Sequence, residues 1–482
     1  MKPIGRFTDL ARLVFFFSEN RISLAGVVIT TASAITLAWF WLIELTSPHP
    51  MHPYTGILFF LLLPGLFFFG LGLIPLGMWL RRKKLRHAGT LPEEFPQVDL
   101  GSSAIRKGLI IVVGATALNI LILGTASFKG VEYMDSTQFC GQACHSVMSP
   151  EFAAYKDSAH SRVTCTQCHI GPGAGWFVKS KISGTRQLFA VTFKTYSRPI
   201  PSPVEHLRPA RETCEQCHWP QKFHGDKMVV RTKFAEDETN TATTSVLLLK
   251  IGGRTWQGLA GIHGRHLDAG ERITYVTTDP RRQSIARITY KDDKGQTVDY
   301  VADDNKLSPE ELAKLPSRSM DCVDCHNRPT HAFEMPGPAL DKAINAQRIS
   351  RDLPFIKKKA MEVLKVDYPD QTTAAAQIPA ALDAFYRTSY PEIYRDKKPL
   401  VDEAATAVKE IYLRNVFPQM KLTWGTHPNH IGHQDSPGCF RCHDGMHNSK
   451  DGKMIAADCD TCHTILAQDE KDPKILKDLQ IK

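Results

Sequence analysis

The chain has 482 residues, enough for two or three domains, and its 59 basic and 50 acidic residues give a formal charge of +9. This basic excess is modest and comes with no stacking motif or basic stripe, so we expect no nucleic-acid partner. Part of it flanks long apolar runs, as in a membrane protein.

Three apolar runs near the N-terminus predict membrane-spanning helices at about residues 22–45, 56–80 and 108–128. The first run is interrupted only by Glu44. It is too long for a typical signal peptide, and no clear small-residue cleavage site follows it. The second run is followed at once by the basic sequence RRKKLRH. Because cationic residues collect on the cytoplasmic side of membrane spans, the third run should exit on the opposite side. We therefore expect a three-helix anchor at residues 1–128 in a bacterial inner membrane, with the remainder in the periplasm.

Six cysteine–histidine motifs follow the third run and use all 12 cysteines of the chain. Five are Cys-x-x-Cys-His motifs, and the first has one extra residue between its cysteines. In a c-type haem site, two thiols add to the vinyl groups of the porphyrin and the adjacent histidine ligates the iron. The predicted sets are Cys140, Cys144 and His145; Cys165, Cys168 and His169; Cys214, Cys217 and His218; Cys322, Cys325 and His326; Cys439, Cys442 and His443; and Cys459, Cys462 and His463.

Two other interpretations of these cysteines are possible. Paired cysteine motifs can bind zinc, and an even number of cysteines in an exported domain can form disulfides. Neither requires a histidine directly after the second cysteine, and only 19 of the 482 residues are histidine. Six such coincidences are improbable, so the sequence predicts six covalently bound haem c groups.

The second axial ligand of each iron separates an electron carrier from a catalyst, because an open position can bind a small substrate. The region after Lys129 contains ten histidines outside the motifs, enough to close every iron and favour a carrier. Met148 is an alternative ligand at the first haem, since thioether ligation is normal for haem iron. The histidine candidates are His160, His224, His331, His433, His447 and, from the sequence GIHGRH, His266 or His263.

The segments between the motifs predict different secondary structures. Residues 226–320 contain five strand-like runs and a KDDKGQ turn, which indicate a small β-hairpin insert. Residues 338–418 show apolar recurrences at three and four positions, typical of helices. With haem segments at 129–225 and 321–482, we expect a mainly α, loop-rich multihaem cytochrome c domain on the membrane anchor. Most of its apolar surface should be buried against the porphyrins.

Residues 108–225 resemble the NapC/NirT family of membrane-anchored quinol dehydrogenases. The shared features are a transmembrane helix, a first haem motif followed by a nearby methionine, the sequence YKDSAH, and a second motif followed by GPGAGWFVKSKISGTRQ. The whole chain resembles the ImcH-like inner-membrane multihaem cytochromes of metal-reducing bacteria. It departs from the NapC/NirT pattern in the later position of Met148, the longer first cysteine spacing, and six motifs in place of the typical four.

The resemblance implies oxidation of menaquinol at the first haem and relay to a periplasmic cytochrome or reductase, with extracellular metal respiration as one destination. It places a lysine and a nearby acidic residue after the second motif. Here Lys179, Lys181, Arg186 and Gln187 occupy that stretch, and none of them is a carboxylate. Lys181 is the first candidate for the quinol site, with Asp157 or Lys156, near the first haem, as its proton partner. A cationic helix face against lipid headgroups is the alternative for these residues.

Two other functions stay open. One is a periplasmic terminal reductase of a small oxyanion such as nitrite, which needs a five-coordinate haem and convergent cationic groups. The other is a structural haem subunit of a larger electron-transfer complex, which would show no quinol activity alone. A homo-oligomer is also open, because a neighbouring chain could supply axial ligands.

Overall fold

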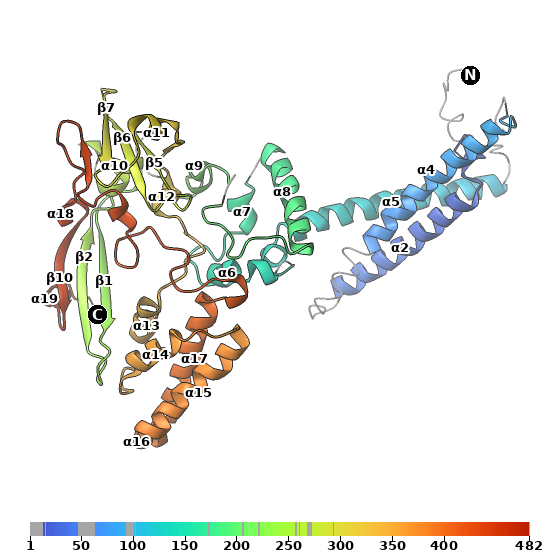
Figure 1. Ribbon diagram of the computed structural model, residues 1–482. Helices are drawn as coiled ribbons and strands as arrows, with labels where there is room; N and C mark the ends of the chain where they lie inside the picture. Colours follow the sequence, from blue (N-terminus) through green and yellow to red (C-terminus); the bar gives the residue numbers. More distant parts are fainter. Residues whose placement is uncertain are drawn as a thin grey trace. The chain divides into compact units, whose positions relative to one another are not determined.

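The computed structural model describes residues 13–14, 16–46, 63–92, 101, 103–143, 145–171, 174–204, 207–219, 222–255, 258–259, 261–267, 272–292 and 294–481. The chain divides into two compact units, Met1–Asp135 and Ser136–Lys482. Figure 1 shows the helices and strands of each. The division falls just after the end of the predicted anchor at residue 128.

The first unit contains the long helices α2 (Arg21–Thr46), α4 (Leu63–His87) and α5 (Ser103–Met134). Among the described residues, two segments are long and apolar enough to cross a membrane, Arg21–Trp39 and Leu63–His87. They match the first two predicted spans, although residues 56–62 lie outside the described part of the chain. The third predicted span, at 108–128, lies within α5 but is not one of these two segments. The three-helix anchor therefore stays a prediction.

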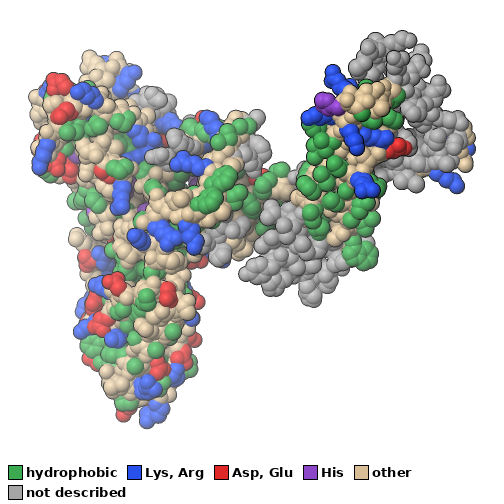
Figure 2. All heavy atoms as spheres, turned by 45° about the vertical axis from the view of Figure 1, so that its right-hand side comes forward, with side chains coloured by type: hydrophobic (Ala, Val, Ile, Leu, Met, Phe, Trp, Pro, Cys, Tyr) green, Lys and Arg blue, Asp and Glu red, His purple; other side chains and the backbone are tan. Residues whose placement is uncertain are grey.

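Small residues bring α2 and α4 close together. A Cβ atom added at Gly70 would lie 2.6 Å from the Thr30 hydroxyl and 2.9 Å from the Gly26 carbonyl oxygen. The Ser23 hydroxyl donates a hydrogen bond to the Ile74 carbonyl at 2.9 Å. Small residues let membrane helices approach closely in this way. In Figure 2 the described side chains of this unit are mostly hydrophobic, and Lys and Arg gather toward one end, as in the basic last turn of α4.

Replacing Gly70 with leucine is expected to separate α2 from α4, because the added side chain has no space at this contact. Overpacking of this kind costs about 1–3 kcal/mol. Gly72→Leu is the matched control, since a Cβ there meets no atom within 4 Å. Photo-crosslinking from a benzophenone side chain at position 71 should capture α2 in the control and much less of it in Gly70→Leu. Equal yields would show that Gly70 does not set the contact.

Two antiparallel sheets form the β part of the second unit. A five-stranded sheet has the order β8 (Ser317–Ser319), β5 (Ile273–Thr277), β6 (Ile285–Lys291), β7 (Thr297–Ala302) and β9 (His447–Ser449). A three-stranded sheet has the order β1 (Lys227–Phe234), β2 (Ala242–Leu249) and β10 (His463–Glu470). A short pair joins β3 (Arg254–Thr255) to β4 (Gly258–Leu259). The five predicted strands are β1, β2, β5, β6 and β7. Each of the larger sheets also takes an edge strand, β9 or β10, from beyond residue 321.

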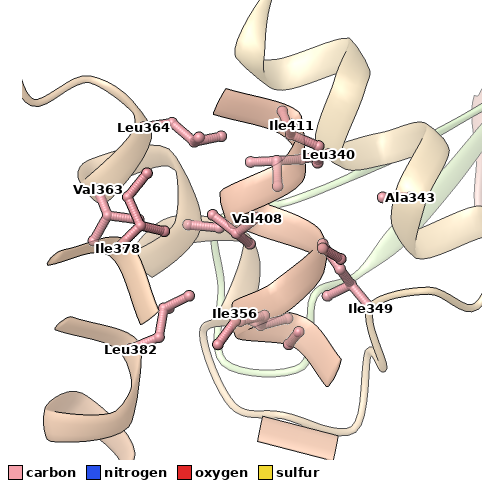
Figure 3. Close-up of a cluster of buried hydrophobic side chains, with 14 of the residues drawn as sticks. Leu340, Ala343, Ile349, Ile356, Val363, Leu364, Ile378, Leu382, Val408 and Ile411 are labelled. Carbon is pink, nitrogen blue, oxygen red and sulfur yellow. The ribbon is translucent and has the colours of Figure 1, made fainter. Parts of the chain in front are cut away.

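The largest hydrophobic core lies in a helical segment without haem motifs. Its helices are α13 (Pro336–Asn345), α14 (Ile356–Leu364), α15 (Gln371–Ser389), α16 (Pro391–Asp396) and α17 (Lys398–Asn415). They lie together in Figure 1, and Figure 3 shows Leu340, Ile356, Ile378 and Val408 converging from four of them. The expectation that porphyrins provide most of the core is wrong for this segment, because its apolar faces cover one another.

Apart from α8, with 19 residues, and α6, with 12, the remaining helices of this unit are short. They are η2 (Phe139–Ala143), α6 (His145–Lys156), α7 (Cys165–His169), α8 (Ala174–Thr192), α9 (Ala210–Cys214), α10 (Gly261–Leu267), α11 (Pro309–Lys314), α12 (Cys322–Cys325), η4 (Pro418–Met420), η5 (Gly438–Arg441), α18 (Cys459–Cys462) and α19 (Lys474–Asp478). The unit is therefore helical with two substantial sheets, and most of its short helices border the cysteine–histidine motifs.

Candidate haem sites

Three of the motifs form single helical turns. Cys165 and Cys168 lie on α7, Cys322 and Cys325 on α12, and α18 runs from Cys459 to Cys462. Residues three apart on a helical turn face the same side, so both thiols of a motif can reach one porphyrin edge. Eleven cysteines fall within the described residues, and none of them forms a disulfide there, so their thiols remain available for thioether attachment.

The thiols of successive motifs lie close enough to influence one another. A hydrogen bond from Cys140 lowers the pKa of Cys165 to about 7, which joins the first motif to the second. Cys322 hydrogen-bonds to Cys214, and this raises the pKa of Cys322, joining the third motif to the fourth.

The other three junctions show the same proximity. Burial and then the charge of Cys214 raise the pKa of Cys168, which links the second and third motifs. Burial and then Cys439 raise the pKa of Cys325 to about 11, linking the fourth and fifth. Burial and then Cys439 also raise the pKa of Cys462, linking the fifth and sixth. The motifs are therefore neighbours in space in their order along the chain.

Five motif histidines each face a histidine from elsewhere in the chain. The pairs, with the distance between ring centres, are His169 and His331 at 6.3 Å, His218 and His160 at 6.0 Å, His326 and His263 at 6.3 Å, His443 and His266 at 5.8 Å, and His463 and His433 at 6.2 Å. The partners come from loops and short helices up to about 180 positions away in the chain, as the sequence numbers show.

These distances fit a metal ion held between two imidazoles. With metal–nitrogen bonds of about 2 Å and a ring centre roughly 1 Å beyond each nitrogen, two imidazoles on opposite sides of one iron lie about 6 Å apart. A direct hydrogen bond between the rings would bring the centres closer, and unrelated rings would show no common spacing. The five pairs therefore have the separation that two axial haem ligands need.

Hydrogen bonds orient the partner rings. Three partner rings have Nδ1 close to a backbone carbonyl oxygen. The distances are 2.9 Å from His331 to Glu151, 2.6 Å from His263 to Ile251, and 2.8 Å from His266 to Ile262. An imidazole that donates Nδ1–H to a carbonyl keeps Nε2 as a lone-pair donor, the arrangement of most metal-ligating histidines. Burial lowers the pKa of His331 to about 4, so its ring is neutral as ligation requires.

Several histidines have other surroundings. His224, predicted as a second ligand, is exposed and forms no described pair with a motif histidine. His447 is buried with Nδ1 2.9 Å from an Asp444 oxygen and Nε2 2.9 Å from the Ile285 carbonyl oxygen, so both ring nitrogens are already engaged. His430 likewise contacts the Asp324 carbonyl and Gln283. His427 is buried, and its Nε2 has no hydrogen-bond partner among the described residues.

The first motif is described only in part. Cys144 and the side chain of His145 lie outside the described residues, and Met148 is half-buried on α6. The prediction of second ligands gave His263 only as an alternative to His266, whereas the structure pairs both with motif histidines. The signal was present in GIHGRH, where two histidines three positions apart share one side of a helix.

The predicted quinol-site residues lie on two helices. Gln187, on α8, is exposed and donates a hydrogen bond to the Ser183 hydroxyl at 3.2 Å. The side chain of Lys181, on the same helix, lies outside the described residues. Asp157 follows α6 and forms a 3.1 Å ion pair with Arg414, while Lys156 stacks on the Phe152 ring. Asp157 is thus engaged by the helical segment.

A buried carboxylate organises the fourth motif. Asp324 is 3% exposed and accepts hydrogen bonds from the Tyr275 hydroxyl at 2.7 Å, Arg318 at 2.9 Å and Arg282 at 3.0 Å. Its second oxygen accepts the Asp321 backbone N–H at 2.7 Å. These contacts join β5, the loop after it, β8 and α12, so the turn that carries Cys322 and Cys325 is fixed to the five-stranded sheet.

Serial cysteine–histidine turns with paired imidazoles define a multihaem c-type cytochrome, a class of electron-transfer protein. Residues 102–200 match the model of the NapC/NirT cytochrome c family, N-terminal region. The chain is also 42% identical over 452 residues to the cytochrome c-type protein ImcH of Geobacter sulfurreducens. The aligned region covers 93% of this chain and 88% of that protein. No solved structure matches the chain. The chain belongs to the NapC/NirT cytochrome c family, in the ImcH-like group that the sequence analysis indicated.

Proposed function

We propose that this protein oxidises menaquinol and relays the electrons through six covalently bound haem c groups to a periplasmic acceptor. The observation that carries the relay is the pairing of five motif histidines with a second histidine at 5.8–6.3 Å. A haem with two protein ligands carries single electrons and offers no open iron position to a substrate. This arrangement favours a carrier over a terminal reductase.

The order of the motifs gives the relay a direction. Each motif adjoins the next through its cysteines, from Cys140 and Cys165 at one end to Cys439 and Cys462 at the other. The first motif follows the first unit in the chain, and the last two motifs lie near the C-terminus. Electrons therefore enter at the first motif and leave from the C-terminal pair to a periplasmic cytochrome or reductase.

Helix α8, directly after the second motif, has the character of a helix at a membrane surface. Val178, Ile182, Leu188 and Phe189 are 54–68% exposed along it. The helix contains Lys and Arg but no Asp or Glu, and Lys179 stacks on the Trp176 ring at 4.4 Å. Exposed apolar residues with basic partners are typical of helices that lie in the lipid interface. This supports access to the membrane quinone pool beside the first two motifs.

We assign the quinol site to this helix, with Lys181 and Gln187 holding the quinone oxygens. Both residues lie on α8, six positions apart in the chain. Asp157 is the proposed proton partner. Its 59% exposed side chain can still meet solvent while it pairs with Arg414. A lysine donor and a solvent-connected carboxylate are the groups that binding a quinol and removing its two protons require.

The test is anaerobic stopped-flow reduction of the detergent-solubilised protein by a menaquinol analogue, read in the haem absorption bands. We expect rapid reduction that a quinone-site inhibitor blocks, and six haems per chain by pyridine haemochrome and intact mass. Lys181→Gln should slow quinol reduction at least tenfold without changing reduction by dithionite. Lys365→Gln, at an exposed position in the helical segment, is the control.

Two outcomes would overturn parts of this proposal. Prompt reduction by dithionite with none by quinol would mean that electrons enter from another protein, as in a haem subunit of a larger complex. Catalytic turnover of nitrite by the isolated, reduced protein would instead establish a terminal reductase.

A further inference from the structure

We propose that the seven-residue helix α10 supplies the second axial ligand to two different haems, His263 at the fourth motif and His266 at the fifth. The inference rests on the proposed haem content and extends it to a shared ligand element. It assigns His263 and His266 to separate irons, where the sequence suggested one ligand from this stretch.

The ring geometry separates the two histidines. The His263 ring lies parallel to the His326 ring, with an angle of 7° and a centre distance of 6.3 Å. The His266 ring lies 5.8 Å from His443 at an angle of 59°. Side chains three positions apart on a helix start about 5–6 Å from each other, so one turn can point two imidazoles into adjacent sites.

Each ring has its Nδ1 engaged and its Nε2 left for the iron. His263 Nδ1 lies 2.6 Å from the Ile251 carbonyl oxygen, and His266 Nδ1 lies 2.8 Å from the Ile262 carbonyl oxygen within α10. The Phe223 ring packs against His263 with a centre distance of 4.6 Å. Such contacts fix the tautomer and the direction of a metal-ligating imidazole.

The residues that follow β2 hold α10 in place. The backbone N–H of Ile262 donates a hydrogen bond to the Lys250 carbonyl oxygen at 2.8 Å, and that of Gly264 donates to the Gly252 carbonyl oxygen at 3.1 Å. A Cβ at Gly264 would overlap the Gly253 carbonyl oxygen, so only glycine permits this approach. Lys250 in turn donates its backbone N–H to Cys462 at 2.9 Å. One backbone stretch therefore positions ligands of the fourth and fifth motifs and contacts the sixth.

A consequence is that the two sites respond together to any displacement of α10. Loss of His263 opens one iron, loss of His266 opens the other, and a shift of the helix loosens both. Carbon monoxide is a suitable probe, because it binds a reduced haem only where an axial position is open.

The experiment measures carbon monoxide bound per reduced chain, with electron paramagnetic resonance of the oxidised protein to count high-spin haems. We expect His263→Ala and His266→Ala each to bind one more carbon monoxide than the unsubstituted protein, and the double variant two more. Gly264→Ala should raise binding above the unsubstituted protein by displacing both ligands. His224→Ala, at the exposed position, should change nothing.

Haem content by pyridine haemochrome accompanies every variant. If an alanine variant fails to assemble, His263→Met and His266→Met keep a ligand, and each should raise the reduction potential of one haem, since methionine ligation raises it. A double variant that opens only one haem, or methionine variants that leave every potential unchanged, would overturn the assignment. These readouts do not involve quinol, so a failed quinol assay would leave them intact.

Discussion

Asp324→Ala is expected to produce one of the two largest losses of stability among single substitutions in the second unit, about 3–5 kcal/mol. The carboxylate is 3% exposed and neutralises Arg282 and Arg318 while accepting the Tyr275 hydroxyl. Removing it leaves two guanidinium groups and a buried hydroxyl without their partner. The two guanidinium side chains are 22% and 34% exposed, so the penalty combines their lost pairing with the unpaired hydroxyl of the buried Tyr275, and it exceeds the value of a surface ion pair.

The matched control is Asp460→Ala. Asp460 also lies between the two cysteines of a motif, the sixth, but its side chain is exposed. Thermal unfolding of the holoprotein, followed by circular dichroism, should show a clearly lower midpoint for Asp324→Ala and an unchanged one for Asp460→Ala. Equal midpoints would mean that the turn, and not the Asp324 network, determines stability at these motifs.

Gly438→Ala is expected to disturb the fifth motif severely. Gly438 has φ +50, a conformation that costs other residues about 1–2 kcal/mol, and a Cβ there would overlap the Gly432 carbonyl oxygen. That carbonyl accepts the Cys439 backbone N–H at 2.9 Å, and Gly432 precedes His433, the partner of His463. The substitution should therefore lower haem attachment at the fifth motif and misplace a ligand of the sixth.

Gly432→Ala provides the comparison, because Gly432 also has positive φ, +78, but a Cβ there meets nothing within 4 Å. Both variants place alanine at positive φ, and only in Gly438→Ala does the added Cβ overlap a carbonyl oxygen. Peptide mapping of haem attachment at Cys439 and Cys442, with the thermal midpoint, measures the difference. Full attachment and a shared midpoint in the two variants would contradict the role given to the close approach.

Local sequence patterns predicted the secondary structure of the second unit well. Alternating apolar residues predicted β1, β2, β5, β6 and β7, because a strand with one buried face has a period of two. They could not predict that β9 and β10 complete these sheets, since strand pairing across more than 130 positions leaves no mark on either strand. The buried stripe of α15, at Ala374, Ile378, Leu382 and Tyr386, continues through Pro379 in spite of the helix-breaking tendency of proline.

The axial ligands show the limit of sequence reasoning more sharply. Nearness in the chain suggested His447 and His224, yet both ring nitrogens of His447 bind protein oxygens and His224 is exposed. Nearness also suggested His331 and His433, and these do lie beside motif histidines, but at the second and sixth motifs and not at the motifs nearest to them in the chain. His331 reaches the second motif from beyond the fourth, and His266 reaches the fifth from before it. Such pairings depend on tertiary structure alone.

The helical segment leaves the haem-binding chain and returns to almost the same point. The Glu334 backbone N–H donates a hydrogen bond to the Asn415 side-chain oxygen at 2.8 Å, and the Glu334 carboxylate pairs with Arg414 at 3.1 Å. The 80 positions between Glu334 and Arg414 thus close on themselves. Once this segment has folded, the connection from Cys325 to Cys439 behaves as a much shorter loop. Loop-closure entropy then opposes the meeting of the fourth and fifth motifs by about 1 kcal/mol less than for an open chain of that length. Since the core of the segment is made of its own side chains, this shortening can precede haem attachment and bring the two motifs within reach of each other.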